Sequence, residues 1–443
     1  MNILLPYGKQ GMEVSLPEKN AHVLTPPGVL ETPSGDPTVA AIESPLGTAP
    51  FEEIVEGKRT ALIAMADHHR FGTYQKEVLS LVLNQLHRAH VGKIRILVAR
   101  GTHPPATRKE WEEMYGKEAL TNYEFLCHDP HDKKNLVDLG TTEKGDPVVV
   151  SRWLLESDLV VGIGLLRPSA RGGYTGGSKL FAVGCAGYST IMSTHKASLY
   201  FHPKSVVGNY QDHPFRERIL AIAKKAEKKS SSEVFFTLNV IQQGQKSLRT
   251  FAGDMEEVWR KGCQFTQTHF EVPVPEPADI LVCGGGFPLD SSAYAFLNSF
   301  TRLYRTNPIP LVREGGVVIT LASLDKEPEN GSMDESILDT IGKIPYERAG
   351  DLIREIENEG KSACKDLEGL HMIMSVAALF NHARGHIFVV GAKNLQTVRR
   401  LRFTPFETFS AALDRALDIT GPGAKILVVP KPTHVLPYVG NKT

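Results

Sequence analysis

The amino-acid sequence predicts an α/β fold of mostly parallel, Rossmann-like sheets flanked by helices. Short apolar runs rich in β-branched residues alternate with segments of helical periodicity, the pattern of buried parallel strands joined by crossover helices. These runs cover residues 60–66, 94–99, 159–166, 280–283, 317–321, 387–390 and 426–429. Between the first two runs, apolar residues recur at helical spacing: Val78, Leu79, Val82, Leu83 and Leu86. This segment is predicted to be the crossover helix of a βαβ unit.

A proline-rich segment predicts a division into two domains. In Glu271-Val-Pro-Val-Pro-Glu-Pro277 the prolines remove backbone donors, so the segment can continue neither a helix nor a central strand. We therefore expect a linker here and place the boundary near residue 275. The N-terminal domain would comprise residues 1–275, and a C-terminal α/β domain, residues 276–443, would close over an active-site cleft between the two.

Composition narrows the class of protein. The chain has 443 residues with 50 basic and 50 acidic side chains, a balance that does not suggest a nucleic-acid partner. No apolar run approaches the roughly 20 residues of a membrane span, and no signal-type segment opens the sequence, so we expect a cytoplasmic protein without a membrane partner. The cysteines are few, widely spaced and odd in number, which favours reduced core or near-core thiols over disulfides or a zinc site: Cys127, Cys185, Cys263, Cys283 and Cys364.

A glycine-rich segment between Arg167 and Lys179 is the most informative stretch of the chain. Glycines at positions 172, 173, 176 and 177 follow a very apolar strand and permit positive φ angles and a close approach to an anionic ligand. The Lys179 amine could pair with a phosphate or become a covalent attachment point. The alternative is a glycine-rich crossover with a surface lysine.

Ordinary nucleotide sites do not match this segment. A P-loop places its lysine directly after the last glycine and a hydroxyl residue after the lysine, whereas here Ser178 precedes Lys179 and Leu180 follows it. No dinucleotide fingerprint opens a helix after a strand either. The sequence therefore disfavours ATP and NAD sites.

Polar residues gather where the predicted strands end, which is where open α/β sheets bind ligands. Asp67-His-His-Arg70 follows the first strand, Gly101-Thr-His103 the second, the Lys179 segment the third, and Gly284-Gly-Gly-Phe-Pro-Leu-Asp290 the fourth. If the first three strands share a sheet, Arg70, His103 and Lys179 converge on one cleft. A single histidine after a strand is more often structural, so the joint occurrence carries the prediction.

In these motifs the sequence resembles the lactate racemase family, which uses a nickel-pincer nucleotide. The resemblance spans nearly the whole chain. It rests on Tyr7-Gly-Lys9, Asp67-x-x-Arg70, Gly101-Thr-His103, Gly173-Tyr-Thr-Gly-Gly-x-Lys179, Thr194-His195, Phe251-Ala-Gly-Asp254, and Gly286-Phe-Pro-x-Asp290 with Tyr294.

The resemblance implies a cofactor site in the N-terminal domain. Lys179 would be tethered to pyridinium-3,5-bisthiocarboxylic acid mononucleotide carrying nickel, with Thr175, Gly176 and Gly177 in the same cofactor-binding loop. His195 would be the protein ligand of the nickel. Imidazole suits nickel, and lysine is the usual residue for a covalent cofactor link. Other proteins would have to make the cofactor.

The resemblance also implies a catalytic role for His103 and a substrate-binding role for Arg70, assisted by Asp67 and Tyr294. A guanidinium clamps a carboxylate through two hydrogen bonds, and a histidine with a pKa of about 6.5 can accept a hydroxyl proton near neutral pH. His103 would take the 2-hydroxyl proton of a small 2-hydroxy acid while hydride moves from the α-carbon to the cofactor. Return of the hydride to the other face of the 2-keto acid would give the inverted product.

The sequence departs from the family pattern at the substrate positions. Ser169 stands after Pro168 where the racemases have a second catalytic histidine, and a serine hydroxyl is too weak an acid or base to replace it unaided. Ala295 and Asn298 replace a glutamine and a lysine. Nearby substitutes for the missing histidine are His68, His69, His202, Lys196 and Arg167.

These departures lead us to expect a racemase or C2-epimerase for a longer, more hydroxylated 2-hydroxy acid, such as a sugar acid, bound in part by Ser169 and Asn298. Two alternatives stay open. Ser169 also fits a non-catalytic relative that binds the cofactor or a hydroxy acid. A conventional metal enzyme could use Cys127-His128-x-x-His131 or His68-His69, but neither pair has a further ligand at a recognisable spacing, so loop or surface histidines are the preferred interpretation.

Overall fold

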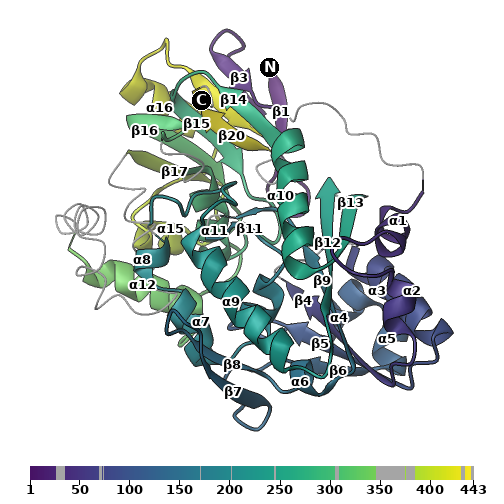
Figure 1. The fold of residues 1–443 in the computed structure, drawn as a ribbon. Helices are drawn as coiled ribbons and strands as arrows, with labels where there is room; N and C mark the ends of the chain where they lie inside the picture. Colours follow the sequence, from purple (N-terminus) through teal and green to yellow (C-terminus); the bar gives the residue numbers. More distant parts are fainter. Residues whose placement is uncertain are drawn as a thin grey trace.

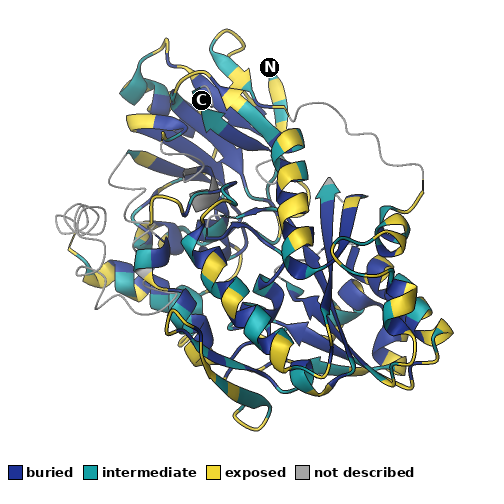
Figure 2. Cartoon of the chain, viewed as in Figure 1, coloured by how far each residue is buried: buried dark blue, intermediate teal, exposed yellow. Residues whose placement is uncertain are grey.

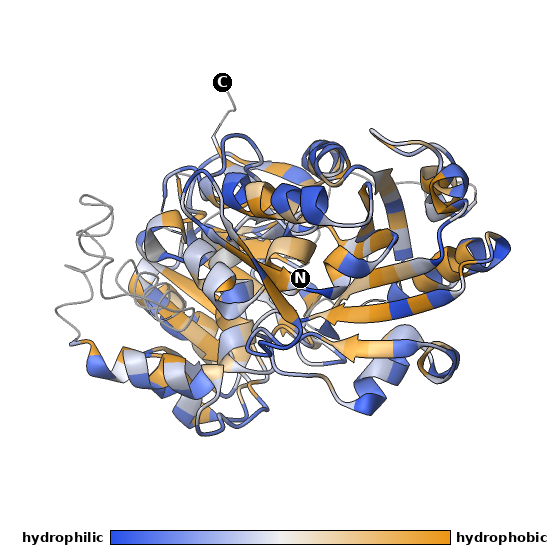
Figure 3. Ribbon diagram, turned by 60° about the horizontal axis from the view of Figure 1, so that its bottom comes forward, coloured by the Kyte–Doolittle hydropathy of each residue, from blue (hydrophilic) through white to orange (hydrophobic). Residues whose placement is uncertain are grey.

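Two six-stranded sheets with helices on their faces make up the molecule (Figure 1). The structure is a computed structural model that describes residues 1–443 except 26–34, 69–71, 73, 170, 201, 244–245, 305–308, 346–374, 376–384, 431–434 and 441–443. The central strands of both sheets are mostly buried, and most exposed residues lie on the covering helices, the loops and the strand ends and edges (Figure 2). The strands are also the most apolar elements (Figure 3).

The first sheet has the strand order β13-β12-β9-β4-β5-β6. Its strands are β4 (Thr60–Ala66), β5 (Lys93–Ala99), β6 (Glu124–Cys127), β9 (Leu159–Leu165), β12 (Phe235–Gln243) and β13 (Lys246–Gly253). All neighbouring pairs are parallel except β12 and β13. Every residue of β9 is buried, as expected of a central parallel strand covered on both faces.

Helices cover both faces of this sheet. On one face α3 (Tyr74–Arg88) and α4 (Arg108–Tyr115) pack with α2 (Phe51–Val55), and on the other α9 (Pro214–Lys229) packs with the π-helical turn η2 (Leu180–Gly184). The predicted crossover helix is confirmed as α3, because the five predicted apolar residues are all buried. Its apolar stripe lies against β4, β5 and β9.

The second sheet is parallel throughout, with the order β18-β17-β16-β15-β19-β3. Its strands are β15 (Ala278–Gly284), β16 (Val312–Leu321), β17 (His386–Val390), β18 (Thr404–Phe406), β19 (Ile426–Val429) and β3 (Ala21–Val23). On one face lie α11 (Ala293–Tyr304), α12 (Met333–Lys343) and α15 (Leu395–Arg400), and on the other α16 (Phe409–Thr420) and the hairpin of β1 (Asn2–Leu5) and β2 (Met12–Ser15).

The two sheets do not follow the predicted division at residue 275 throughout, because the start of the chain joins the second sheet. β3 pairs with β19, and the hairpin of β1 and β2 packs in the same core. The proline-rich segment is also more than a linker: β14 (Glu271–Val274) pairs in parallel with β20 (Leu436–Val439) in a separate two-stranded sheet. Next to it, α10 (Met255–Phe270) packs against β12 and β13 of the first sheet and against β14 and β20.

The remaining elements are short. They are α1 (Pro37–Glu43), α5 (Lys117–Asn122), β7 (Leu136–Thr141), β8 (Pro147–Ser151), α6 (Trp153–Glu156), β10 (Pro168–Ser169), β11 (Gly173–Tyr174), α7 (Tyr188–Thr194) and α8 (Ala197–Tyr200). All seven predicted strands are confirmed as parts of β4, β5, β9, β15, β16, β17 and β19. No helix within the described ranges is long and apolar enough to cross a membrane.

One prediction about the cysteines is wrong and one falls outside the described residues. Cys185, Cys263 and Cys283 are buried, as expected of core thiols, but Cys127 is exposed at the end of β6. β6 is the edge strand of its sheet, which explains why its last side chain is not covered. Cys364 lies outside the described residues.

Candidate functional site

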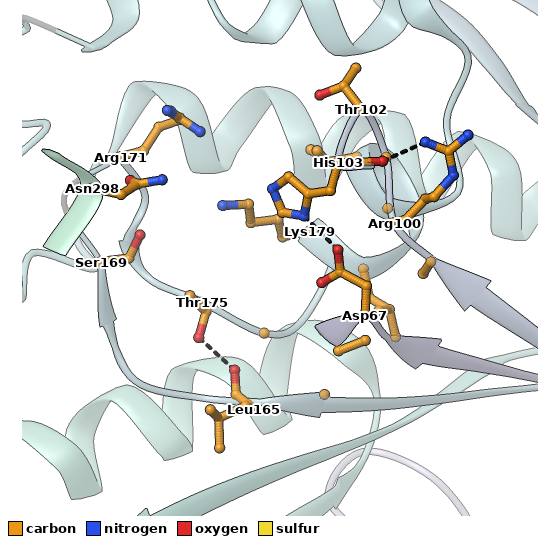
Figure 4. Close-up of a pocket in the computed structure, with 18 of the residues that line it drawn as sticks. Asp67, Arg100, Thr102, His103, Leu165, Ser169, Arg171, Thr175, Lys179 and Asn298 are labelled. Atoms are coloured by element: carbon orange, nitrogen blue, oxygen red, sulfur yellow. Dashed lines mark hydrogen bonds and ion pairs between the residues drawn. The ribbon is translucent and has the colours of Figure 1, made fainter. Parts of the chain in front are cut away.

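A cavity with about 850 Å³ of space, including its open mouth, lies at the carboxyl ends of β4, β5 and β9 (Figure 4). Residues that follow these strands and residues of α11 line it together. They are Ala66, Asp67, Ala99, Arg100, Gly101, Thr102, His103, Gly164, Leu165, Ser169, Arg171, Thr175, Gly176, Lys179, Leu180, Val183, Gly184, His195, Tyr294 and Asn298.

His103 and Asp67 form a hydrogen-bonded pair on one side of the cavity. Asp67 directly follows β4 and is almost fully buried, and its Oδ2 lies 2.5 Å from Nδ1 of His103. Because a carboxylate only accepts hydrogen bonds, Nδ1 carries the proton and the neutral ring has its lone pair at Nε2. The Tyr294 ring lies 6.2 Å from the His103 ring, so α11 of the second sheet reaches the same place.

His195 is held in one tautomer at the end of α7. Its Nδ1 lies 2.8 Å from the carbonyl oxygen of Ile191 and 3.0 Å from Oγ1 of Thr194. A carbonyl can only accept, so Nδ1 is protonated and Nε2 keeps the lone pair that a metal ligand needs. Burial, with the charges of Arg171 and Lys179, holds the pKa of His195 well below its ordinary value, which keeps the ring neutral.

Lys179 lines the cavity at the start of η2, and its ammonium lies 5.7 Å from the centre of the Phe215 ring. The loop that carries it is fixed from behind by α9 and α10. Arg216 donates from Nε to the Gly172 carbonyl and from a terminal nitrogen to the Gly176 carbonyl, both at 2.9 Å. Trp259 donates to the Thr175 carbonyl at 3.2 Å and stacks on Arg216.

Two glycines of this loop make room for protein atoms. Gly176 and Gly177 have φ angles of 81° and 57°. A Cβ at Gly176 would lie 2.6 Å from Oδ1 of Asn239, and one at Gly177 would lie 2.8 Å from Cβ of Trp259. Gly176 still lines the cavity, whereas Gly177 is not among the lining residues.

The Thr175 hydroxyl is also used within the loop. It donates to the Leu165 carbonyl and accepts the Arg167 N–H at 3.1 Å. These two bonds tie the loop to the end of β9, so Thr175 contributes mainly to the position of the loop. The cofactor contacts of Thr175, Gly176 and Gly177 stay predictions, and of these three residues Thr175 and Gly176 line the cavity.

Two cavity arginines were not predicted as site residues. Arg171 is 8% exposed in the glycine-rich loop, and its guanidinium lies 5.9 Å from the centre of the Tyr200 ring. Arg100 follows β5, lies 3.7 Å from Asp129, and donates to the His103 carbonyl. The signal for both was present, because each is a cation in a segment that follows a central strand.

Some of the predicted substrate residues line the cavity, and others do not or are not described. Ser169 and Asn298 line the cavity, and Ser169 is paired with Gly173 in the small sheet of β10 and β11. Ala295 is buried but is not among the lining residues. Arg70 lies outside the described residues.

None of the described substitutes for the second histidine lines the cavity. His202 and Lys196 are exposed, and His68 and Arg167 are not among the lining residues. The fifth substitute, His69, lies outside the described residues. Of the residues that the structure describes, Ser169 is the one that lines the cavity at the position where the family pattern has a second base.

The alternative metal site at Cys127-His128-x-x-His131 is not supported. His128 is buried, its Nε2 donates to the Ala186 carbonyl at 2.9 Å, and burial lowers its pKa to about 4. His131 is exposed and stacks on Tyr188, with ring centres 4.7 Å apart. No group of three or more histidine, cysteine or acidic side chains that could hold a metal occurs among the described residues.

Three motifs outside the cavity have structural explanations. Asp290 is fully buried, and its Oδ2 accepts the Gly8 N–H at 2.7 Å, so the motif containing Asp290 binds the one containing Tyr7 and Lys9. Asp254 caps α10 by accepting the Glu256 N–H at 2.8 Å. These residues join the start of the chain to β15 and the end of β13 to α10.

The fold and the cavity define a class: α/β proteins of two parallel sheets in which a buried neutral histidine, a lysine and a histidine–carboxylate pair face one cavity. The family described as lactate racemase N-terminal domain matches residues 7–208. The chain is 27% identical to lactate racemase of Thermoanaerobacterium thermosaccharolyticum, covering 98% of this chain and 99% of that protein. It is 25% identical to lactate racemase of Lactiplantibacillus plantarum, covering 88% of each.

Solved structures agree with these matches. The lactate racemase apoprotein of Thermoanaerobacterium thermosaccharolyticum superposes over all of both chains with a TM-score of 0.83 and 25% identity. A Thermotoga maritima protein, 17% identical, covers 92% of this chain and 99% of its own with a TM-score of 0.67, which shows a shared fold. Residues 7–208 match the lactate racemase N-terminal domain family, and the relatives that match over most of the chain are lactate racemases, which are isomerases.

Proposed function

We propose that this chain is a 2-hydroxyacid racemase or C2-epimerase that works by reversible hydride transfer with a nickel-pincer nucleotide tethered to Lys179. The observation that carries the proposal is the meeting of Lys179, His195 and His103 in one cavity. A protein that only binds a hydroxy acid needs neither a metal-binding imidazole nor a proton acceptor. The similarity to lactate racemases supports the same activity class.

The residues present fit the proposed cofactor. The Nδ1–H of His195 is bound to a carbonyl, so its Nε2 lone pair is available to nickel, and imidazole is a suitable nickel ligand. Lys179 supplies the amine for the covalent link, and Arg171 adds a positive charge that suits an anionic nucleotide. When bound, the cofactor would supply the hydride acceptor and donor. Biosynthetic proteins that make and deliver it are proposed partners.

The protein's own share of the chemistry is proton transfer and positioning. His103 would accept the proton of the substrate's 2-hydroxyl at Nε2 and return it in the second half of the reaction. Asp67, bonded to Nδ1, would stabilise the imidazolium that forms. Arg70, which the sequence assigns to the substrate carboxylate, keeps that role as a proposal.

A substrate larger than lactate is part of the proposal. Ser169 and Asn298 line the cavity at the positions where the family pattern has a histidine and a lysine, and both can bond hydroxyl groups. A single base at His103 also suits interconversion of diastereomers, which need not be handled symmetrically. A hydroxylated 2-hydroxy acid, such as a sugar acid, fits these side chains better than a methyl group does.

The proposed setting is the cytoplasm, and the proposed organisation is a first domain that holds the cofactor and a second that closes over it. Tyr294 and Asn298, both on α11, would come from the closing domain. Closure would exclude water from the hydride-transfer step. The β14 strand, which pairs with β20, is the connection about which such a movement would occur.

The first test is the intact mass and nickel content of the wild type and of Lys179→Ala, each produced in cells that also make the pincer nucleotide. We expect a nickel-containing adduct on the wild type that is absent from the variant. Lys196→Ala is the matched control, because Lys196 is exposed and does not line the cavity. It should load like the wild type.

Two outcomes would count against the proposal. If the wild type carried no adduct and no nickel while a known family member was loaded in the same cells, the racemase proposal would fail and a binding protein would become the better description, which Ser169 favours. If the loaded protein inverted C2 of lactate only, and no sugar acid in a screen followed by chiral chromatography, the substrate part would be refuted.

A further inference from the structure

The turn that carries His103 is closed by two hydrogen bonds between its first and last residues. The backbone N–H of His103 donates to the carbonyl oxygen of Arg100 at 3.0 Å, which is the ordinary bond of a β-turn. In the other direction, the guanidinium of Arg100 donates to the carbonyl oxygen of His103 (Figure 4). The side chain of Arg100 therefore adds a second bond that the backbone of the turn does not supply.

This second bond holds the chain where its own backbone can do little. Pro104 and Pro105 follow His103, and a proline has no N–H to donate. The guanidinium of Arg100 instead fixes the peptide unit after His103 through the carbonyl oxygen, while the turn bond fixes the peptide unit before it. Both peptide units that flank the Cα atom of His103 are thus held.

These contacts decide where the His103 ring points. Since φ and ψ are the two soft backbone torsions of a residue, holding both flanking peptide units fixes the direction of its Cα–Cβ bond. The ring is held separately by Asp67, whose Oδ2 lies 2.5 Å from Nδ1. The backbone contacts and Asp67 together set the place of Nε2, the proton acceptor in the proposed function.

The start of the turn is fixed to the helical turn η2, which begins beside Lys179. Gly101 donates its N–H to the carbonyl oxygen of Gly184 at 2.9 Å. A Cβ at Gly184 would lie 2.9 Å from Cβ of Ala99, so the end of β5 is in close contact with η2. The first residues of the turn therefore have a set position relative to Lys179, and Arg100 extends this order to His103.

Arg100 is itself placed to hold an acceptor in a fixed direction. Its side chain is 15% exposed, and its second terminal nitrogen lies 3.7 Å from Oδ1 of Asp129, outside the cavity. The planar guanidinium fork presents its donors at fixed angles, so a carbonyl on one branch and a carboxylate near the other define its orientation. A lysine would keep the charge but not the fork.

We propose that Arg100 is a positioning residue for the reaction, holding the backbone of His103 so that Nε2 faces the 2-hydroxyl of the substrate. This inference rests on the proposed function and deepens it, because it names the residue through which the proton acceptor is held. Arg100 also lines the cavity, so direct binding of the substrate carboxylate is the competing role, and the kinetic test below separates the two.

The first test follows the Nδ1 proton of His103 by NMR in wild type, Arg100→Met and Arg100→Lys. A proton shared with a carboxylate resonates far downfield, and its loss in Asp67→Asn assigns it. Arg100→Met should make this proton exchange with water about tenfold or more faster, because a hydrogen bond from a charged donor contributes that much. Arg100→Lys, which keeps one charged donor, should give an intermediate rate.

Arg95 supplies the matched control. It lies in β5, its side chain is 19% exposed, it pairs with Glu124 at 2.8 Å, and it is not among the lining residues. Arg95→Met should leave exchange of the His103 proton unchanged. Equal acceleration in Arg95→Met and Arg100→Met would show a general loss of stability and overturn the proposal, as would unchanged exchange in Arg100→Met.

Turnover of the loaded enzyme separates holding from binding. Arg100→Met should lower kcat about tenfold or more and leave KM within about twofold of the wild type, with partial recovery in Arg100→Lys. Nickel content and intact mass should match those of the wild type. A KM raised about tenfold with unchanged kcat would assign Arg100 to the substrate and contradict the positioning role.

Failure of the proposed function would give a different result from failure of this inference. A wild type without adduct or nickel would refute the racemase, yet the exchange measurement needs no cofactor and would still decide whether Arg100 holds His103. A loaded, active wild type whose His103 proton and kcat are both insensitive to Arg100→Met would refute the positioning role alone.

Discussion

Two histidines, His195 and His128, are both buried but have opposite relations to the cavity. Each donates one ring N–H to a backbone carbonyl, and burial is the main reason that the pKa of each lies below its ordinary value. His195 donates from Nδ1 to Ile191 and lines the cavity, whereas His128 donates from Nε2 to Ala186 and does not.

The difference teaches that burial and a lowered pKa do not mark a functional histidine. Both rings are neutral near pH 7 for the same physical reason. Two features distinguish His195. Its unprotonated nitrogen is Nε2 rather than Nδ1, and its ring lines the cavity. In the sequence, His195 was assigned through the family resemblance, and Cys127-His128-x-x-His131 was set aside because it has no further ligand at a recognisable spacing.

The largest expected effect is on nickel. His195→Ala should reduce the nickel bound per chain more than tenfold in cells that make the pincer nucleotide, because the protein ligand is removed, while His128→Ala should load normally. Metal analysis of both purified variants measures this. Equal nickel loss in the two variants would show that burial of a histidine, not its place in the cavity, decides loading.

A third histidine sharpens the comparison, since His103 has a carboxylate partner instead of a carbonyl. Asp67→Asn should lower kcat by about 10–100-fold, because an amide cannot stabilise the imidazolium that forms at His103. Nickel content should not change, since the proposed metal ligand is His195. Steady-state kinetics with the best substrate from the screen tests this, and an unchanged kcat would remove His103 from the proton-transfer role.

The fold was predictable where strands are buried on both faces. β4 and β9 read as continuous apolar runs because helices cover both sides of the sheet. β12 was missed because Asn239 stands at its centre, fully buried, where it accepts the Gly177 N–H. β3 has three residues and is a strand because it pairs with β19, about four hundred residues away. No local signal could therefore have assigned the start of the chain to the second sheet.

The site was predictable as a set of residue types but not as a set of contacts. Lys179 and His103 follow central strands, and their meeting follows from parallel topology. The glycines at 176 and 177 gave the same signal as a ligand loop, but the atoms that need the space belong to Asn239 and Trp259, which are distant in sequence. The burial of Arg171 likewise depends on surroundings that the sequence of the loop does not contain.

His128 should matter for stability where His195 matters for the metal. His128→Ala should lower the free energy of unfolding by about 2–4 kcal/mol, because it leaves a cavity and an unbonded carbonyl at Ala186. His131→Ala is the matched control, since that ring is exposed, and it should change stability by about 0.5 kcal/mol or less. Urea unfolding measures both, and equal losses would mean that the bond to Ala186 contributes nothing.

The smallest expected effect is the pH dependence of the contribution that His128 makes to the free energy of unfolding. The pKa of His128 is lowered to about 4 in the fold, chiefly by burial and also by the charge of Arg100, although the hydrogen bond to the Ala186 carbonyl and the charges of Asp129 and Asp132 act in the opposite direction. Unfolding returns the pKa to about 6.5. Below about pH 6.5, His128 is therefore protonated in the unfolded chain but not in the folded protein. The contribution of His128 to the free energy of unfolding is present above that pH and is lost as the pH falls toward 4.

Relative to pH 8, the loss through His128 should reach about 2 kcal/mol at pH 5. Glutamine can donate to the Ala186 carbonyl but does not titrate, so the wild type should lose about 2 kcal/mol more than His128→Gln between these pH values. Because His195 titrates in both proteins, its contribution cancels in this difference. Parallel pH profiles in urea unfolding would mean that His128 is not held neutral by the fold, and that the two buried histidines differ in more than their place relative to the cavity.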